Sequence, residues 1–174
     1  MRFGNVFESS GSVIPIFKKQ INLGQPITVT SKNATRFFMS IPEAVILILS
    51  AQKIANGNEI FIFEMGKPVK IYDLAHRMIN LSGKKIKRQE NDTGIEIVET
   101  GLREGEKLYE ELLIDFDMQS TPNEKILIAR ENSLTSKEFE KMRSQMIKIL
   151  ETNQDKDVKK FLRAWVKEYL IVLK

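Results

Sequence analysis

The sequence predicts an α/β fold through about residue 115, followed by amphipathic helices. Short β-rich runs alternate there with helix-like runs, and Ile60–Phe63 is a continuous apolar run of strand length. After about residue 120, apolar residues recur at helical spacing instead. The chain has 174 residues, 42% of them hydrophobic and 29% charged, which is ordinary for a soluble globular protein with a real core.

The first part of the chain carries most of the predicted strands. Strands are expected over residues 2–7, 27–30, 36–41, 60–63 and 95–98, with one last strand over 125–129. The run 60–63 has no polar residue, which is typical of a buried parallel strand.

Helices are predicted between these strands and in the last third of the chain. The helix over 13–21 begins after Ser12, which can cap it, and Pro15 falls in its first turn, where a missing N–H costs little. Further helices are expected over 42–54 and 71–81. Two amphipathic stripes close the chain, formed by Phe139, Met142, Met146 and Ile149, and by Phe161, Trp165 and Tyr169 beside Leu162, Val166 and Leu170. Such stripes are more often core or oligomer interface than a ligand platform.

Composition excludes several function classes. The net charge of +4 comes from 27 basic and 23 acidic residues spread along the chain, so no nucleic-acid partner is expected. There is no cysteine and a single histidine, His76, which excludes disulfides, thiolate chemistry and a histidine-rich metal site. No apolar run is long enough for a membrane span, and the N-terminus lacks the apolar core of a signal peptide, so a cytoplasmic location is expected.

A candidate anion-binding turn lies at residues 101–105, followed by a helix-like run. Gly101 and Gly105 allow positive-φ backbone, and Arg103 between them can bind two phosphate oxygens with its fork of donors. Glu106 can accept hydrogen bonds from sugar hydroxyls. The alternative is a surface turn with a solvated Arg–Glu pair.

No complete catalytic set is found. None of the nine glycines has dinucleotide-binding or P-loop spacing, and none of the three tyrosines is followed four residues later by lysine. A Gly-x-Ser-x-Gly elbow is also missing. Spacing and composition alone therefore indicate an α/β domain with one candidate anion-binding turn.

Several motifs in a fixed order carry a family resemblance. They are Arg2-Phe3-Gly4-Asn5-Val6, Ser9 to Pro15, Pro26 to Thr30, Thr35 to Met39, Pro42-Glu43-Ala44, Met65 to Val69, and the turn at 101–105. Together they resemble the C-terminal half of bacterial nucleotide-sugar 4,6-dehydratases of capsule, O-antigen and flagellin-glycan synthesis. These enzymes belong to the extended short-chain dehydrogenase/reductase superfamily, which has a Rossmann-type fold. The resemblance covers residues 1–131 as the nucleotide-sugar-binding portion, and leaves 132–174 as a helical extension.

The resemblance implies a binding site for a UDP-sugar, usually UDP-N-acetylglucosamine. Asn5 is expected near the sugar–diphosphate. Arg36 and Arg103 are expected to bind the diphosphate from two sides, and Glu106 to hold ribose hydroxyls. The uracil wall is expected from the helix start between Val13 and Lys18 and from the backbone of Ile27, Thr28, Val29 and Thr30.

The resemblance also implies what this chain does not carry. The family uses NAD(P), but its glycine-rich cofactor loop and acid–base residues lie in an N-terminal half that is missing here, so the chain is expected to be inactive alone. The expected partners are such a Rossmann half or a second copy, since the opening strand and the strand over 60–63 are expected to have lost sheet neighbours, which leaves apolar faces and backbone edges exposed. A stand-alone binding module and a decayed remnant are the alternatives.

Three places depart from the family pattern, and one of them is the turn Ser31-Lys32-Asn33-Ala34 before the segment that begins at Thr35. Glu8 stands where glycine is usual, which is expected to bring negative charge near the diphosphate unless the side chain points outward. Glu104 replaces a proline in the arginine turn, which loosens that corner.

Overall fold

The computed structural model describes residues 1–57, 59–89, 91–110, 117–130, 134–152, 154–166 and 169. It divides into two compact units, Met1–Glu131 and Asn132–Lys174, which are described one after the other.

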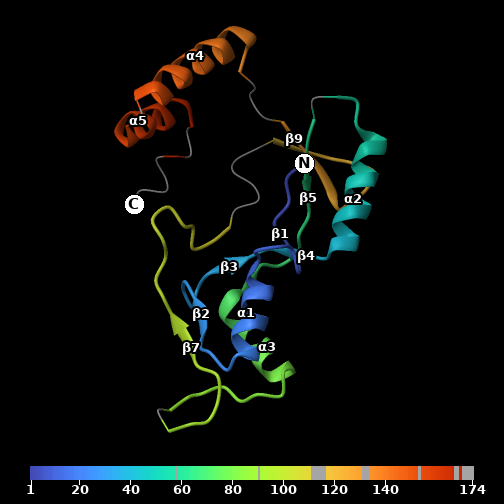
Figure 1. Ribbon diagram of the computed structural model, residues 1–174. Coiled ribbons are helices and arrows are strands. Elements are labelled where there is room, and N and C mark those ends of the chain that lie inside the picture. Colours follow the sequence, from blue (N-terminus) through green and yellow to red (C-terminus); the bar gives the residue numbers. More distant parts are fainter. Residues whose placement is uncertain are drawn as a thin grey trace. The chain divides into compact units, whose positions relative to one another are not determined.

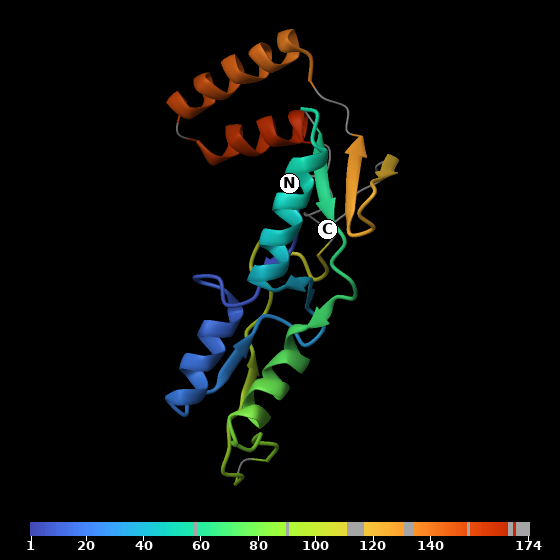
Figure 2. The same ribbon diagram turned by 90° about the vertical axis from the view of Figure 1, so that its right-hand side faces the viewer.

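Three helices and nine short strands form the described part of the first unit (Figures 1 and 2). The helices are α1 (Val13–Asn22), α2 (Ile41–Ile54) and α3 (Ile71–Leu81). The strands are β1 (Asn5–Val6), β2 (Ile27–Val29), β3 (Thr35–Arg36), β4 (Phe38–Met39), β5 (Ile60–Phe63), β6 (Val69–Lys70), β7 (Ile97–Glu99), β8 (Asp117–Ser120) and β9 (Ile126–Arg130). β1 pairs with β4 and β2 with β7 in parallel, whereas β3–β6 and the order β5–β9–β8 are antiparallel.

One hydrophobic core joins α1, α3 and β2, which lie side by side in Figures 1 and 2. Phe17 and Ile21 of α1 pack with Ile27 of β2 and with Ile79 of α3, and all four are almost fully buried. These apolar contacts hold α1 against β2, and they position the start of the helix relative to the strand.

A second core joins α2 to the antiparallel sheet. Leu47 and Ala51 of α2 pack against Phe61 and Phe63 of β5, with Ile126 of β9 in the same cluster. Ser40 caps α2 by accepting a hydrogen bond from the Glu43 N–H at 3.2 Å.

Residues 60–63 form the predicted buried strand, but the predicted parallel pairing and the exposed apolar face need correction. β5 pairs along its whole length with β9, antiparallel, with Phe63 opposite Ile126. On its other side Arg2 forms a parallel bridge with Ile62, through a 2.7 Å bond from the Arg2 N–H to Phe61 O. The opening strand has neighbours too, since β1 pairs with β4. β9 thus pairs with one edge of β5, and the run is apolar throughout because Phe61, Ile62 and Phe63 are all buried.

Other local predictions also need correction. Ser12 occupies the N-cap position of α1 but makes no side-chain capping bond. The strand expected over 36–41 is split into β3 and β4, and the structure adds β6 and β8, which no sequence pattern predicted. The helix-like run predicted after the arginine turn is not a helix over residues 106–110, where Tyr109 forms a parallel bridge with Thr35. The rest of that run, residues 111–113, lies outside the described part of the chain.

The second unit contains two amphipathic helices, α4 (Ser136–Thr152) and α5 (Asp155–Trp165). They pack on each other, and the Trp165 Nε1–H donates to Gln145 Oε1 at 2.8 Å. α5 ends earlier than its predicted stripe, and Leu170 lies outside the described residues. Neither helix has a fully buried residue among those described, and Phe139 and Leu150 are exposed. These helices thus form a hairpin with only half-buried contacts.

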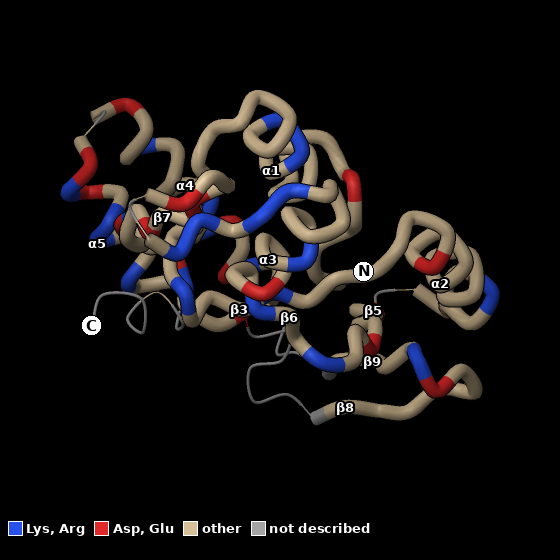
Figure 3. Tube along the Cα trace, turned by 90° about the horizontal axis from the view of Figure 1, so that it is seen from below, with Lys and Arg blue, Asp and Glu red and all other residues tan. Residues whose placement is uncertain are grey.

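Charges of both signs are spread along the chain. Figure 3 shows lysine and arginine positions interspersed with aspartate and glutamate positions along the described trace. Among the described residues, no helix combines the length and apolar character that crossing a membrane requires.

Gly94 is a position where we expect a single methyl group to destabilise the first unit. A Cβ there lies 2.6 Å from the Lys85 carbonyl oxygen and 2.9 Å from the Lys87 nitrogen, the two groups that bond to the backbone of buried Ile95. We expect Gly94→Ala to lower the free energy of unfolding by about 1–3 kcal/mol in urea unfolding. Thr93→Ala, on the exposed neighbour, is the control, and equal stability of the two variants contradicts the close approach.

Candidate functional site

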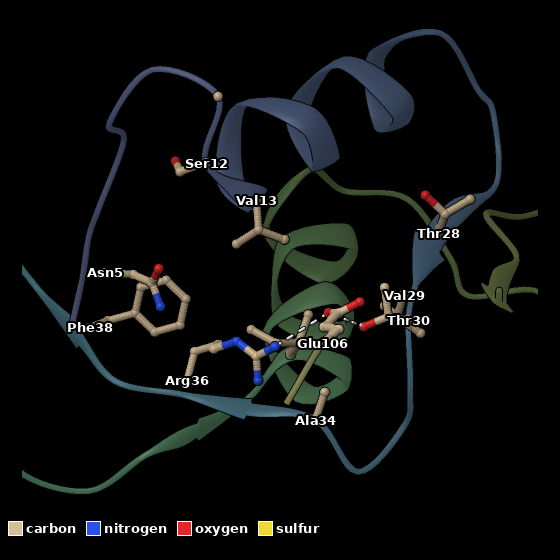
Figure 4. Close-up of a pocket in the computed structure, with 12 residues that line it drawn as sticks. Asn5, Ser12, Val13, Thr28, Val29, Thr30, Ala34, Arg36, Phe38 and Glu106 are labelled. Atoms are coloured by element: carbon tan, nitrogen blue, oxygen red, sulfur yellow. Dashed lines mark hydrogen bonds and ion pairs between the residues drawn. The ribbon is translucent and has the colours of Figure 1, made fainter. Parts of the chain in front are cut away.

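A cavity of about 280 Å³ opens in the first unit between the start of α1, the edge of β2 and the strand β3 (Figure 4). Its lining combines charged, hydroxyl and amide groups with apolar walls. The lining residues are Asn5, Gly11, Ser12, Val13, Thr28, Val29, Thr30, Ala34, Arg36, Phe38, Ile71 and Glu106. The cavity therefore brings together seven of the predicted site residues. They are Asn5, Val13, Thr28, Val29, Thr30, Arg36 and Glu106.

Asn5 lines the cavity beside Phe38, its register partner in the parallel pair of β1 and β4. Its Nδ2 donates to Phe37 O at 3.3 Å and to Glu110 Oε2 at 3.4 Å, and the same carboxylate oxygen accepts the Phe37 N–H at 3.1 Å. Gly4 allows this approach, since a Cβ at that position lies 2.9 Å from the Phe37 Cβ. The amide of Asn5 is thus held in one orientation by its neighbours.

Arg36 is the central cation of the cavity. Nη1 donates to Thr35 O at 2.8 Å and to Leu108 O at 3.3 Å, and Nη2 donates to Glu106 Oε1 at 3.3 Å. Its side chain is 21% exposed. These bonds use at most three of the five guanidinium N–H donors. The guanidinium is therefore held in place at the cavity wall and still has N–H groups available for a ligand.

Glu106 links the arginine turn to the cavity. Oε1 accepts from the Thr30 hydroxyl at 3.0 Å as well as from Arg36, and Oε2 accepts the Arg103 N–H at 3.2 Å. Gly101 and Gly105 have φ of 87° and 79°, which confirms the predicted positive-φ turn.

Arg103 does not line the cavity. Its side chain is exposed, and its guanidinium makes no hydrogen bond or ion pair with the described part of the chain. Its backbone positions Glu106, while the role of its side chain in a two-sided clamp stays a prediction.

The start of α1 supplies neutral donors. Gly11, Ser12 and Val13 line the cavity, and the first N–H groups of a helix have no partner within the helix. The Ser12 hydroxyl oxygen is buried and has no hydrogen-bond partner among the described residues. A helix N-terminus with a nearby hydroxyl favours a negatively charged ligand.

β2 presents one backbone edge to the cavity. The Ile27 N–H donates to Glu96 O at 2.8 Å, and Val29 O accepts the Thr100 N–H at 2.8 Å, so these two residues face β7. Thr28 between them points its N–H and C=O the opposite way, toward α1. Ile27 itself is fully buried in the core and does not line the cavity.

Lys18 does not line the cavity either. It pairs with Glu8 at the surface, and this hydrogen bond, followed by the Lys18 charge, lowers the pKa of the Glu8 carboxyl from its usual value. Glu8 is also absent from the cavity lining, and its carboxylate points to Lys18.

Glu8 has a φ of 61°, the one positive φ among the described non-glycine residues. We expect Glu8→Gly to raise the melting temperature slightly, because glycine takes this conformation without strain while an exposed ion pair contributes little. Differential scanning fluorimetry measures the change, and Glu8→Ala, which keeps a Cβ, is the control. A drop for glycine as large as for alanine contradicts the strain argument.

Sequence reasoning missed several residues of this site. Phe38 follows Arg36 by two positions on the same face of an extended run, so alternation could have identified it. Ala34 and Ile71 have no such signal. Glu110, which holds Asn5, lies 105 residues away in the chain, and only the fold brings the two together.

Comparison with known proteins identifies the family. The family model described as "Polysaccharide biosynthesis protein" matches residues 1–131. The chain belongs to this family. It is 59% identical over 113 residues to the capsular polysaccharide biosynthesis protein CapD of Staphylococcus aureus, covering 65% of this chain and 18% of that one. It is also 38% identical over 122 residues to an inverting UDP-N-acetylglucosamine 4,6-dehydratase of Campylobacter jejuni, covering 69% and 32%.

A solved structure is similar to this chain in three dimensions. It is the X-ray structure of Pen from Bacillus thuringiensis. The match covers 79% of this chain and 45% of the Pen chain, with a TM-score of 0.63 and 35% sequence identity. This confirms the predicted α/β class as part of an extended short-chain dehydrogenase/reductase fold. The chain thus spans between about a fifth and a half of the length of these three proteins.

Proposed function

We propose that this chain is the substrate-binding part of a nucleotide-sugar dehydratase or epimerase in surface polysaccharide synthesis, and that its ligand is a UDP-sugar. The supporting observation is the cavity in which the start of α1, the edge of β2, Arg36 and Glu106 converge. The Campylobacter relative, named for UDP-N-acetylglucosamine, suggests the sugar.

The diphosphate takes the charged part of the cavity in this proposal. Arg36 offers its remaining donors, and the Ser12 hydroxyl and the first N–H groups of α1 offer neutral ones. Glu106 is placed to accept from ribose hydroxyls, which replace the Thr30 hydroxyl as donor. Its carboxylate also balances the charge of Arg36 while no ligand is bound.

The uracil ring takes the edge of β2. Adjacent N3–H and O4 of uracil present one donor and one acceptor, the pattern that the Thr28 C=O and N–H can pair with. Val13 supplies an apolar contact at the other wall of the cavity.

The NAD(P) that the family uses does not fit the residues of this chain. Apart from Gly101 and Gly105, which share one turn, the glycines with positive φ lie in separate turns, and no three of the nine have the spacing that cradles a pyrophosphate. We therefore assign no catalytic step to these residues, and propose that a Rossmann half supplies the cofactor site and the acid–base groups.

The outer face of α2 is a candidate surface for that partner. Ile41, Val45, Ile46 and Leu49 are each about half exposed or more, at 51%, 48%, 62% and 55%. Alone, we expect the chain to self-associate through this face. Light scattering should detect the association, and Val45→Lys combined with Leu49→Lys should reduce it. Lys53→Gln is the control, and a wild-type monomer contradicts the expectation.

Calorimetric titration of UDP and UDP-N-acetylglucosamine into the chain tests the proposed function. Binding of both with a thermal shift is expected, because a ligand that binds only the folded form must stabilise it. No binding and no shift at millimolar UDP contradicts the proposal and favours a decayed remnant.

A further inference from the structure

A hydrogen-bonded tie between α1 and β2 occupies the strand edge beside the cavity. Gln20 Nε2 donates to the Thr28 hydroxyl at 3.0 Å, and the Thr28 N–H donates to Gln20 Oε1 at 3.4 Å. The side-chain amide thus presents an acceptor and a donor to the strand, the same pair of groups that a uracil imide presents.

The bond to the Thr28 N–H is the weak half of this tie. At 3.4 Å it is longer than the usual N–H···O distance of about 2.9–3.0 Å. Thr28 is exposed and lines the cavity, whereas Gln20 reaches it from beyond the cavity lining. A ligand can therefore approach the N–H that Gln20 holds.

We propose that Gln20 is an internal competitor of the nucleobase: its Oε1 holds the Thr28 N–H while the site is empty and yields it to a base carbonyl. This inference rests on the proposed function, because it assumes that a pyrimidine nucleotide binds at β2. It assigns to Gln20 a regulatory role in that site, setting affinity by competition.

Two opposite effects follow for variants of Gln20. The tie joins α1 to β2, so its loss lowers the stability of the empty protein. Removing the Gln20 amide also tightens binding of the base, because the base no longer has to displace Gln20 Oε1 from the Thr28 N–H. A purely structural role predicts lower stability with equal or weaker binding.

Titration of uridine into the full chain separates these roles, because uridine has no phosphate whose charge could respond to the variants. We expect Gln20→Ala to bind uridine about two- to tenfold more tightly than wild type. Gln20→Glu, which keeps the acceptor and strengthens it by charge, should bind more weakly by a similar factor. Gln52→Ala on the exposed part of α2 is the matched control and should change neither affinity nor stability.

An affinity of folded Gln20→Ala equal to or below that of wild type overturns the proposal, with folding checked by circular dichroism. If Gln20→Ala does not fold, the order of Gln20→Glu and wild type decides, together with the shift of the Thr28 amide resonance on uridine addition. Binding of UDP with no dependence on Gln20 overturns this inference alone. No binding of uridine or UDP to any variant overturns the proposed function as well.

Discussion

Replacing Arg36 by methionine should weaken UDP binding by about ten- to a hundredfold, the loss typical of charge-assisted hydrogen bonds. The guanidinium is held by the carbonyls of Thr35 and Leu108, so it needs little reorganisation to bind phosphate. Its loss also leaves the Glu106 carboxylate without its cation beside a dianionic ligand. Calorimetric titration of UDP into both proteins measures the effect.

Companion variants separate the contribution of the fork from that of charge alone. Arg36→Lys keeps the charge without the planar fork and should fall between wild type and Arg36→Met. Arg77→Met, on the exposed side of α3, is the matched control and should bind like wild type. Unchanged UDP affinity of folded Arg36→Met would falsify the phosphate assignment.

Arg103 decides whether the clamp has two sides. A loss for Arg103→Met comparable to that for Arg36→Met supports the two-sided arrangement, in which the exposed side chain moves onto the ligand. An affinity unchanged from wild type leaves Arg103 with its backbone role toward Glu106.

Local sequence patterns predicted the helices of the first unit well, because each has its own signals. α1 has an apolar stripe, and α2 has a capping serine with a proline in its first turn. The environment of β5 could not be predicted in the same way. Its partner β9 is distant in the sequence, and no local signal encodes an antiparallel pairing of Phe63 with Ile126.

The candidate site was predicted where motifs carry the chemistry and missed where only the fold does. Arg36 and Glu106 are 70 residues apart, yet both were identified, and the structure pairs them at 3.3 Å. The contacts that orient the site come instead from Glu110 and Gln20, whose side chains bond to other segments of the chain. Residues of this kind have no motif of their own, because their role depends on what the fold places beside them.

Replacing Phe17 by alanine should lower the free energy of unfolding by about 3–5 kcal/mol, the range for truncating a buried aromatic residue. Phe17 is 1% exposed and packs with Ile21, Ile27 and Ile79, so the surrounding helices and strand cannot easily close the cavity left behind. Urea unfolding followed by circular dichroism measures the loss. Leu81→Ala, at a side chain 88% exposed in the same unit, is the control and should change stability by less than about 0.5 kcal/mol.

The same substitution connects the core to the site. Phe17 fixes α1 against β2, and both elements line the cavity, so a loosened core should also weaken UDP binding. Because a domain of this size is stable by only about 5–15 kcal/mol, the loss removes a large share of that stability. Binding by Phe17→Ala that matches wild type, at a temperature where the variant is folded, shows that the cavity does not depend on this packing. A stability change no larger than that of Leu81→Ala contradicts the role of Phe17 in the core.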